Sequence, residues 1–153
     1  MSNVSKVRCL KHLCLKHLCL RHFLKIRNRS NLVGIYVYLN GVLELFPYYI
    51  GRPTPHKIIP LDKGLCGATF REGKTLIVND VTRDERYLAC SEHTKSEIVV
   101  PIRNDEGEII GEIDIDSDYI DAFNETDKSF LENVANEISS LVKRYVELKK
   151  RDR

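Results

Sequence analysis

Two periodicities of apolar positions divide the chain into elements. From Thr126 to about Lys150 the apolar residues recur at helical spacing, with Asn124 or Thr126 as the candidate N-cap. Residues 6–27 contain good helix formers and neither Gly nor Pro, which also favours a helix. Between these helices, β-rich runs predict strands or extended segments at Val33–Leu39, Val42–Ile50, Lys57–Pro60, Thr75–Val78, Glu97–Arg103 and Glu108–Asp116, with a short helix from Gly64 through Arg71.

Turn signals give these strands an antiparallel order. Asn40-Gly41 is a strong hairpin signal between the first two strands, and Asp105-Glu106-Gly107 separates the last two. The predicted fold class is therefore α+β, with an antiparallel sheet flanked by N- and C-terminal helices. We expect a basic helical segment at residues 1–29 and one globular domain at residues 30–153.

The strand from Glu108 to Asp116 carries an unusual row of acids. Alternate residues of a strand share a face, so Ile113 and Ile115 are predicted to face the core and Glu112, Asp114 and Asp116 the other side. Carboxylates in such a row lie about 7 Å apart and repel one another. A half-covered face would need a cation or shared protons, whereas an open acidic face would need neither. The pattern alone leaves both alternatives open.

Three further residues are candidates for chemistry. Glu97, on the neighbouring strand, is either a surface charge or a member of the same acidic face, where its neighbours would favour the protonated form. Cys66 lies at a predicted helix N-terminus, where free amide groups stabilise a thiolate. Cys90 lies in the polar stretch 79–96, which is longer than most connections. Either cysteine is alternatively a small buried apolar residue.

Composition narrows the class of protein. The chain has 153 residues, 42% hydrophobic and 30% charged, which suits a single soluble domain. It has no apolar run of membrane-spanning length and no secretory signal, so we expect a cytoplasmic protein that does not enter a membrane. In that compartment the five cysteines favour reactive, metal-binding or buried roles over a disulfide framework.

The N-terminal segment is basic and repetitive. The first 30 residues carry eight Lys or Arg and no acid, so the rest of the chain has a net charge of −6 against a total of +2. A solvated basic helix explains this better than nucleic-acid or membrane binding, because the remaining sequence has no nucleic-acid-binding pattern. Cys9-Leu10-Lys11-His12-Leu13 recurs from Cys14 and loosely from Cys19. A period of five does not keep the Cys–His pairs on one helix face, so we predict no metal site there.

Four motifs in order resemble the free methionine-(R)-sulfoxide reductases, which are GAF-domain enzymes. They are Gly64-Leu65-Cys66-Gly67, Ala89-Cys90, Ser96-Glu97-Ile98-Val99-Val100-Pro101 and Asp114-Ile115-Asp116-Ser117. The resemblance covers roughly residues 30–140 and includes Val33-Gly34-Ile35-Tyr36. It implies a six-stranded antiparallel sheet with flanking helices, and usually a homodimer.

Carried over by position, the resemblance implies roles for single residues. Cys90 is the implied nucleophile and Cys66 the resolving cysteine, while Glu97, Asp114, Asp116 and Tyr36 are the implied substrate-binding residues. Glu112 is left out of this set.

The implied reaction reduces free methionine-(R)-sulfoxide to methionine. Carboxylates would bind the substrate's ammonium group, and protonated Glu97 would donate to the sulfoxide oxygen. Cys90 would become a sulfenic acid, Cys66 would form a disulfide with it, and a thioredoxin-like reductant would reopen the disulfide. No metal or organic cofactor is expected.

Departures from the family pattern keep a second interpretation open. His56 stands where the family commonly has a further cysteine, Leu32 replaces a tryptophan, and Ser91-Glu92-His93 replaces the usual residues after the loop cysteine. The alternative is a non-catalytic GAF domain that binds or senses a small molecule. The pair Cys66 and Cys90 favours the enzyme, and His56 favours the alternative. A nucleic-acid accessory protein is a third and weaker interpretation.

Overall fold

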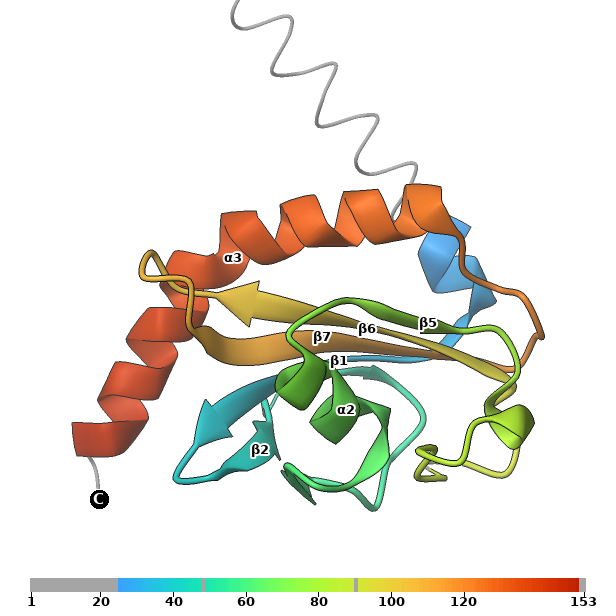
Figure 1. Ribbon diagram of the computed structural model, residues 1–153, viewed down its shortest axis with the longest axis horizontal. Coiled ribbons are helices and arrows are strands. Elements are labelled where there is room, and N and C mark those ends of the chain that lie inside the picture. Colours follow the sequence, from blue (N-terminus) through green and yellow to red (C-terminus); the bar gives the residue numbers. More distant parts are fainter. Residues whose placement is uncertain (1–24, 48, 90, 152–153) are drawn as a thin grey trace, which may run out of the picture.

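A computed structural model describes residues 25–47, 49–89 and 91–151, in which seven strands form one antiparallel sheet (Figure 1). The strand order is β4-β2-β1-β7-β6-β5, and the short β3 pairs with β1 outside this path. The strands are β1 Ser30–Leu39, β2 Val42–Leu45, β3 Ile50–Gly51, β4 Ile58–Pro60, β5 Leu76–Val78, β6 Ser96–Arg103 and β7 Ile109–Ser117. Helix α3 (Glu125–Arg151) covers one face, α2 (Gly64–Glu72) lies on the other, and η1 (Val81–Arg83) is one 3₁₀ turn. The predicted α+β class is confirmed.

The central strands β1, β7 and β6 separate two apolar clusters. On the α3 side, Ile113 and Ile115 pack with residues of β1, β6 and α3, as the alternation predicted. On the α2 side, Val99 of β6 packs with Leu65 and Cys66 of α2. Because α2 covers this second face, the side chains of β7 that point toward it lie inside the protein.

The short helix α2 begins at Gly64, as predicted, and extends one residue beyond Arg71. Gly67 allows it to approach the preceding segment closely, since a Cβ at this position would lie 2.6 Å from the Leu61 carbonyl oxygen. The helix ends at Gly73, whose φ of 65° is the left-handed conformation of a helix C-cap. These contacts fix where Cys66, in the first turn, faces the sheet.

Asn124 is the N-cap of α3, which decides between the two predicted candidates. Its side-chain Oδ1 accepts hydrogen bonds from the backbone N–H groups of Thr126 at 2.9 Å and Asp127 at 3.1 Å. Asp127 Oδ2 in turn accepts from the Asn124 N–H at 3.0 Å. This reciprocal cap satisfies orphan donors of the first turn.

One predicted element is wrong: the return strand Val42–Ile50 is not continuous. β2 ends at Leu45, and β3 forms a separate pair with β1 in which Ile50 lies opposite Val33. Pro47 lies in the interruption and has no N–H to continue a ladder. The other predicted strand boundaries differ from the structure by no more than three residues.

Most of the predicted N-terminal helix, with its Cys/His repeat, lies outside the described residues. Residues 25–29 are helical, and Ile26 is buried in the cluster beneath α3. The division between residues 29 and 30 stays a prediction. None of the described helices combines the length and the apolar character that crossing a membrane requires.

Candidate functional site

Four acids from two neighbouring strands share the face covered by α2. Glu112, Asp114 and Asp116 come from β7, and Glu97 of β6 lies opposite Asp116 in the ladder. Their exposed fractions are 4% for Glu97, 0% for Glu112 and 1% for both aspartates. We call these four residues the acid cluster. The structure thus excludes the exposed acidic face, and it places Glu97 with the other acids.

Cys66 of α2 faces the acid cluster. It is a free, buried cysteine. Its Sγ and one carboxylate oxygen each of Glu97 and Asp114 all lie within 4.8 Å of one another. The helix and the two strands therefore bring a thiol and carboxyl groups into one small, enclosed space, although these residues are far apart in the sequence.

The acid cluster lacks compensating partners within the described residues. Both carboxylate oxygens of Glu112 and of Asp116, and Oδ1 of Asp114, are buried without a hydrogen-bond partner there. Among the described side chains, the ion pairs involve none of the four acids. An unpaired buried carboxylate costs several kcal/mol. These acids must therefore hold protons or receive a cation.

Burial accordingly shifts the titration of the whole group. It raises the pKa of Glu97, Glu112 and Asp116 well above their ordinary values, and the charge of Asp114 adds to the effect. Burial raises the pKa of Asp114 to about 6, while contacts with Glu97 and Cys66 act in the opposite direction. The raised pKa of Glu97 favours its protonated form, which can donate a hydrogen bond.

Of the two alternatives for Cys66, a stabilised thiolate or a small buried residue, the structure favours the second. Cys66 does lie in the first turn of α2, as predicted. However, burial raises the pKa of its thiol well above the ordinary value, and the charges of Asp114, Glu112 and Glu97 raise it further. The nearby carboxyls and the loss of solvent outweigh the amide groups of the helix end.

Tyr36 and His56 form the wall beside the acid cluster. Tyr36 is fully buried opposite Glu112 in the β1–β7 ladder, and its hydroxyl donates to the His56 carbonyl oxygen at 2.6 Å. The Nε2 atom of His56 lies 2.9 Å from the carbonyl oxygen of Ala89. His56 thereby contacts the residue that precedes Cys90 in the chain.

Cys90 itself lies outside the described residues. Its predicted role as nucleophile and its predicted disulfide with Cys66 therefore stay predictions.

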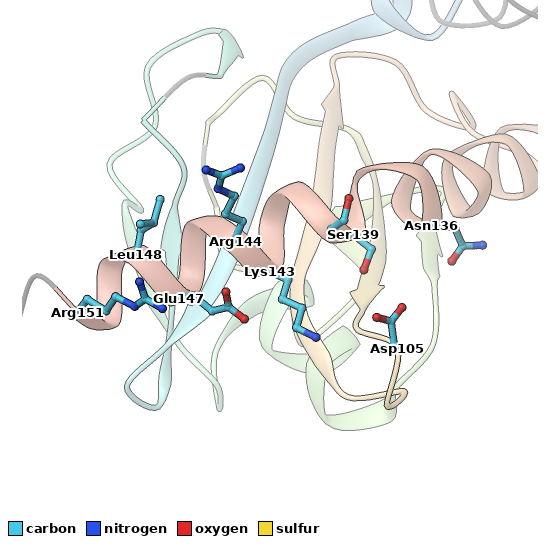
Figure 2. A pocket seen from close by; sticks show the side chains of 9 residues that line it. Asp105, Asn136, Ser139, Lys143, Arg144, Glu147, Leu148 and Arg151 are labelled. Atoms are coloured by element: carbon cyan, nitrogen blue, oxygen red, sulfur yellow. The ribbon is translucent and has the colours of Figure 1, made fainter.

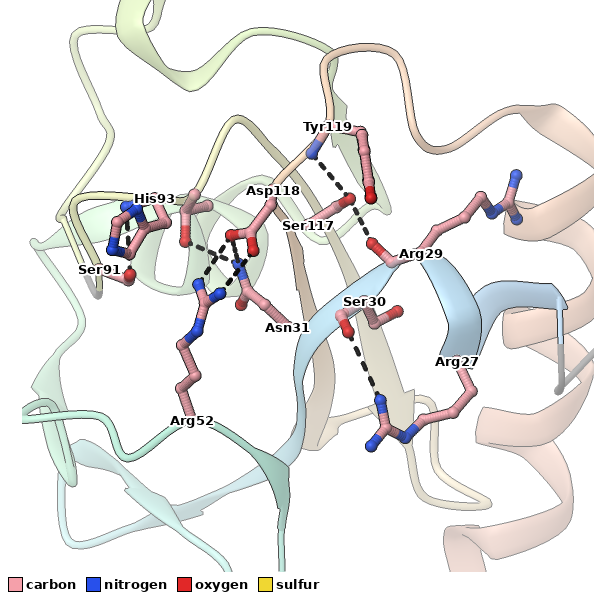
Figure 3. A network of polar contacts seen from close by, with 11 residues as sticks. Arg27, Arg29, Ser30, Asn31, Arg52, Ser91, His93, Ser117, Asp118 and Tyr119 are labelled. Atoms are coloured by element: carbon pink, nitrogen blue, oxygen red, sulfur yellow. Dashed lines mark hydrogen bonds and ion pairs between the residues drawn. The ribbon is translucent and has the colours of Figure 1, made fainter.

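A polar network joins the segments around the end of β7 (Figure 3). The carboxylate of Asp118 accepts from Arg52 Nη1 at 2.9 Å and Nη2 at 2.7 Å, and from Asn31 Nδ2 at 2.6 Å. The same amide of Asn31 lies 3.5 Å from Thr94 Oγ1, in the stretch that follows Cys90. The charge of Asp118 contributes to the raised pKa of Asp116. The network thus connects the rim of the site to the acid cluster.

A hollow of about 510 Å³ lies elsewhere on the molecule. It runs along α3 and the β6–β7 turn (Figure 2), and its lining carries charges of both signs, including Asp105, Lys143, Arg144 and Glu147. It contains neither a thiol nor a member of the acid cluster. The chemistry of the enclosed acids and Cys66 makes that region the stronger candidate, despite the size of this hollow.

The sequence interpretation placed Glu112 on the same face as Asp114 and Asp116 but left it out of the implied substrate-binding set, whereas the structure brings it into the acid cluster. It is fully buried, both of its oxygens lack a partner among the described residues, and it acts on the Cys66 thiol. The signal was present, because Glu112 shares the alternation of Asp114 and Asp116 along β7.

Comparisons with known proteins agree with this geometry. Residues 20–142 match the GAF domain family. The chain is 42% identical over 83 residues to a free methionine-R-sulfoxide reductase of Saccharomyces cerevisiae, covering 54% of this chain and 46% of the relative. The chain spans about half the length of this relative and of a GAF domain-containing protein of Dictyostelium discoideum that it also matches.

Solved structures extend the likeness over most of the chain. The type II free methionine-R-sulfoxide reductase of Thermoplasma acidophilum matches with a TM-score of 0.75 and 38% identity, covering 85% of this chain and 90% of that one. The free methionine-R-sulfoxide reductase of Neisseria meningitidis, solved with its substrate, matches with a TM-score of 0.67 and 32% identity over 81% and 71% of the two chains. The chain therefore belongs to the GAF domain family, and free methionine-R-sulfoxide reductases are among its curated relatives and its structural neighbours.

Proposed function

We propose that the protein reduces free methionine-(R)-sulfoxide to methionine. The observation that carries this proposal is the acid cluster, in which buried carboxyl groups lack a cation among the described residues. A free amino acid brings an ammonium group with three N–H donors. A methionine sulfoxide within a peptide chain has no such group, so the cluster favours the free amino acid.

Within this proposal the acids divide into two roles. Asp114, with a pKa of about 6, ionises most readily, and it receives the ammonium together with Asp116 and Glu112. Glu97 keeps its proton, because burial and the charge of Asp114 raise its pKa, and donates it to the sulfoxide oxygen. Tyr36 forms the buried wall on the β1 side.

The reaction then proceeds through cysteine chemistry. The Cys90 thiolate attacks the sulfoxide sulfur, the oxygen passes to the cysteine sulfur with a proton, and methionine leaves with Cys90 as a sulfenic acid. The Cys66 sulfur attacks that sulfenic sulfur, which forms a disulfide and releases water. A dithiol of thioredoxin type then reduces the disulfide, so the net reaction converts sulfoxide and dithiol to methionine, disulfide and water.

The remaining expectations belong to the same proposal. The protein acts in the cytoplasm as a homodimer, with a thioredoxin-like protein as its reductant. It requires no metal or organic cofactor for turnover.

The test is an epimer-resolved assay. The purified full chain, with a dithiol reductant, is incubated with each epimer of free methionine sulfoxide, and methionine is measured by chromatography. We expect consumption of the R epimer alone, no turnover by Cys90→Ser, and a single turnover by Cys66→Ser under a thioredoxin-type reductant. Binding of the R epimer without consumption would instead support the non-catalytic GAF domain that His56 favours. Full activity of Cys90→Ser would overturn the nucleophile assignment.

A further inference from the structure

The same thiol and carboxyl groups are spaced for a transition-metal ion. The Sγ of Cys66 and one oxygen each of Glu97 and Asp114 lie within 4.8 Å of one another. In a tetrahedral zinc site, with Zn–S near 2.3 Å and Zn–O near 2.1 Å, ligand atoms lie about 3.4 to 3.6 Å apart. Rotation of the side chains, which moves the ligand atoms by about 1 Å, would bring them to the spacing of a tetrahedral zinc site.

A further buried carboxyl group, that of Glu112, lies next to Cys66, although it is not one of the three groups that lie within 4.8 Å of one another. Glu112 is fully buried, neither of its oxygens has a hydrogen-bond partner among the described residues, and its carboxyl lies against the Cys66 thiol. A buried carboxyl group without a partner is itself a sign of a missing ligand. With Glu112 the site offers one sulfur and up to three carboxylates.

We propose that Cys66, Glu97, Asp114 and Glu112 form a binding site for Zn²⁺, which occupies the place of the substrate's ammonium group and thereby inhibits the enzyme. The competition, though not the metal site, rests on the proposed function. Zinc is borderline-soft and accepts thiolate and carboxylate ligands in an enclosed tetrahedral site. Mg²⁺ prefers oxygen ligands and retains several waters, so a buried site that includes sulfur favours Zn²⁺ over Mg²⁺.

Metal binding has two consequences for turnover. The ion holds Asp114, so the ammonium group loses one of its proposed partners. It also holds the Cys66 sulfur, which then does not attack a sulfenic acid. Zinc should therefore compete with the sulfoxide and should also block recycling of the oxidised enzyme.

The experiment uses the full chain in which Cys9, Cys14 and Cys19 are replaced by Ser, so that the N-terminal repeat offers no rival thiols. The protein is kept reduced with a phosphine and titrated with Co²⁺, whose bond to a thiolate gives a charge-transfer band in the near ultraviolet. Competition with a chelating dye then measures the affinity for Zn²⁺. We expect one equivalent of metal and a thiolate band that Zn²⁺ removes and Mg²⁺ does not.

Single substitutions in this background identify the ligands. Cys66→Ser should abolish the band. Both Cys66→Ser and Asp114→Asn should weaken Zn²⁺ binding by at least about tenfold, because loss of even an outer-shell partner of a metal ligand typically costs that much affinity. The exposed-acid control Asp105→Asn should leave both the band and the Zn²⁺ affinity unchanged. Circular dichroism checks that each variant is folded. A band that persists in Cys66→Ser, or no band in the background protein, would overturn the site.

The substrate separates the two proposals. Free methionine-(R)-sulfoxide should lower the apparent affinity for Zn²⁺ as its concentration rises. If the metal binds through Cys66 while the sulfoxide leaves that affinity unchanged, the metal site stands and the placement of the ammonium on Asp114 is refuted.

Discussion

Substitution of Asp114 tests whether the acid cluster favours ligand binding at a cost to the stability of the folded protein. Its side chain is 1% exposed, its Oδ1 has no hydrogen-bond partner among the described residues, and burial raises its pKa to about 6. Asp114→Asn keeps the shape of the side chain and removes its charge, and the new amide group can donate to neighbouring carboxylates. We expect this substitution to stabilise the ligand-free protein at neutral pH.

The size and the sign follow from the raised pKa. The ordinary value is 3.8 and the folded value is about 6, so over this interval the folded state holds a proton that the unfolded state has lost. The stability that this group contributes is full below pH 4 and is lost as pH rises through 6. A shift of about two units corresponds to about 3 kcal/mol, an upper value because Glu97 shares the same titration. For a chain of this size, a gain of that size would raise Tm by about 6 to 12 °C.

The assay is thermal unfolding of wild type, Asp114→Asn and the control Asp105→Asn at pH 4.5 and 7.5. The gain of Asp114→Asn should be large at pH 7.5 and small at pH 4.5, and the control should follow wild type at both. Substrate at 100 times its Kd should stabilise wild type by about 2.7 kcal/mol, and the variant by clearly less at the same concentration. A lower Tm for Asp114→Asn at pH 7.5 would refute the reasoning, because the carboxylate would then make a stabilising contact.

Three further substitutions test contacts that position the elements around the acid cluster. Gly67→Ala should lower stability by about 1 to 3 kcal/mol, because its Cβ would lie 2.6 Å from the Leu61 oxygen; an unchanged Tm would show that α2 moves freely. Asn124→Ala removes the cap of α3 and should cost about 1 kcal/mol in denaturant melts, whereas Asn124→Ser should recover most of it. Arg52→Ala breaks a half-exposed pair with Asp118 and should cost less than about 1 kcal/mol, with the difference disappearing in high salt; a loss that is insensitive to salt would contradict a mainly electrostatic pair.

Local patterns predicted those parts of the fold that local physics decides. The alternation along β7 correctly predicted that Ile113 and Ile115 share the core face, and the spacing of apolar residues correctly predicted helix α3. The break in the return strand was also locally readable, because Pro47 cannot continue a ladder. The prediction of one strand from Val42 to Ile50 relied on β propensity alone and did not take Pro47 into account.

Long-range packing decides what the local patterns left open. Whether the acidic face of β7 is open or covered depends on α2, which ends at Glu72, well before β7 begins at Ile109. The protonation state of Cys66 could not be predicted from the sequence for the same reason. Its place in the first turn of α2 favours a thiolate, whereas burial and the carboxyl groups of two distant strands favour the thiol. The alternation along β7 placed Glu112 on the acidic face, but its burial depends on α2.

The opposing effects on the Cys66 thiol imply that, in the proposed reaction, this cysteine becomes reactive only after an amino acid has bound. Burial, and then the charges of the acid cluster, raise the pKa of the Cys66 thiol, so the proposed resolving sulfur is a weak nucleophile when no ligand is bound. An ammonium group bound to Asp114 would offset part of that negative charge and lower the pKa of the thiol. Cys66 would then gain reactivity in the presence of an amino acid in the site, when a sulfenic acid on Cys90 needs to be resolved. The buried acids that weaken the ligand-free fold would in this way link substrate binding to the chemistry of the second cysteine.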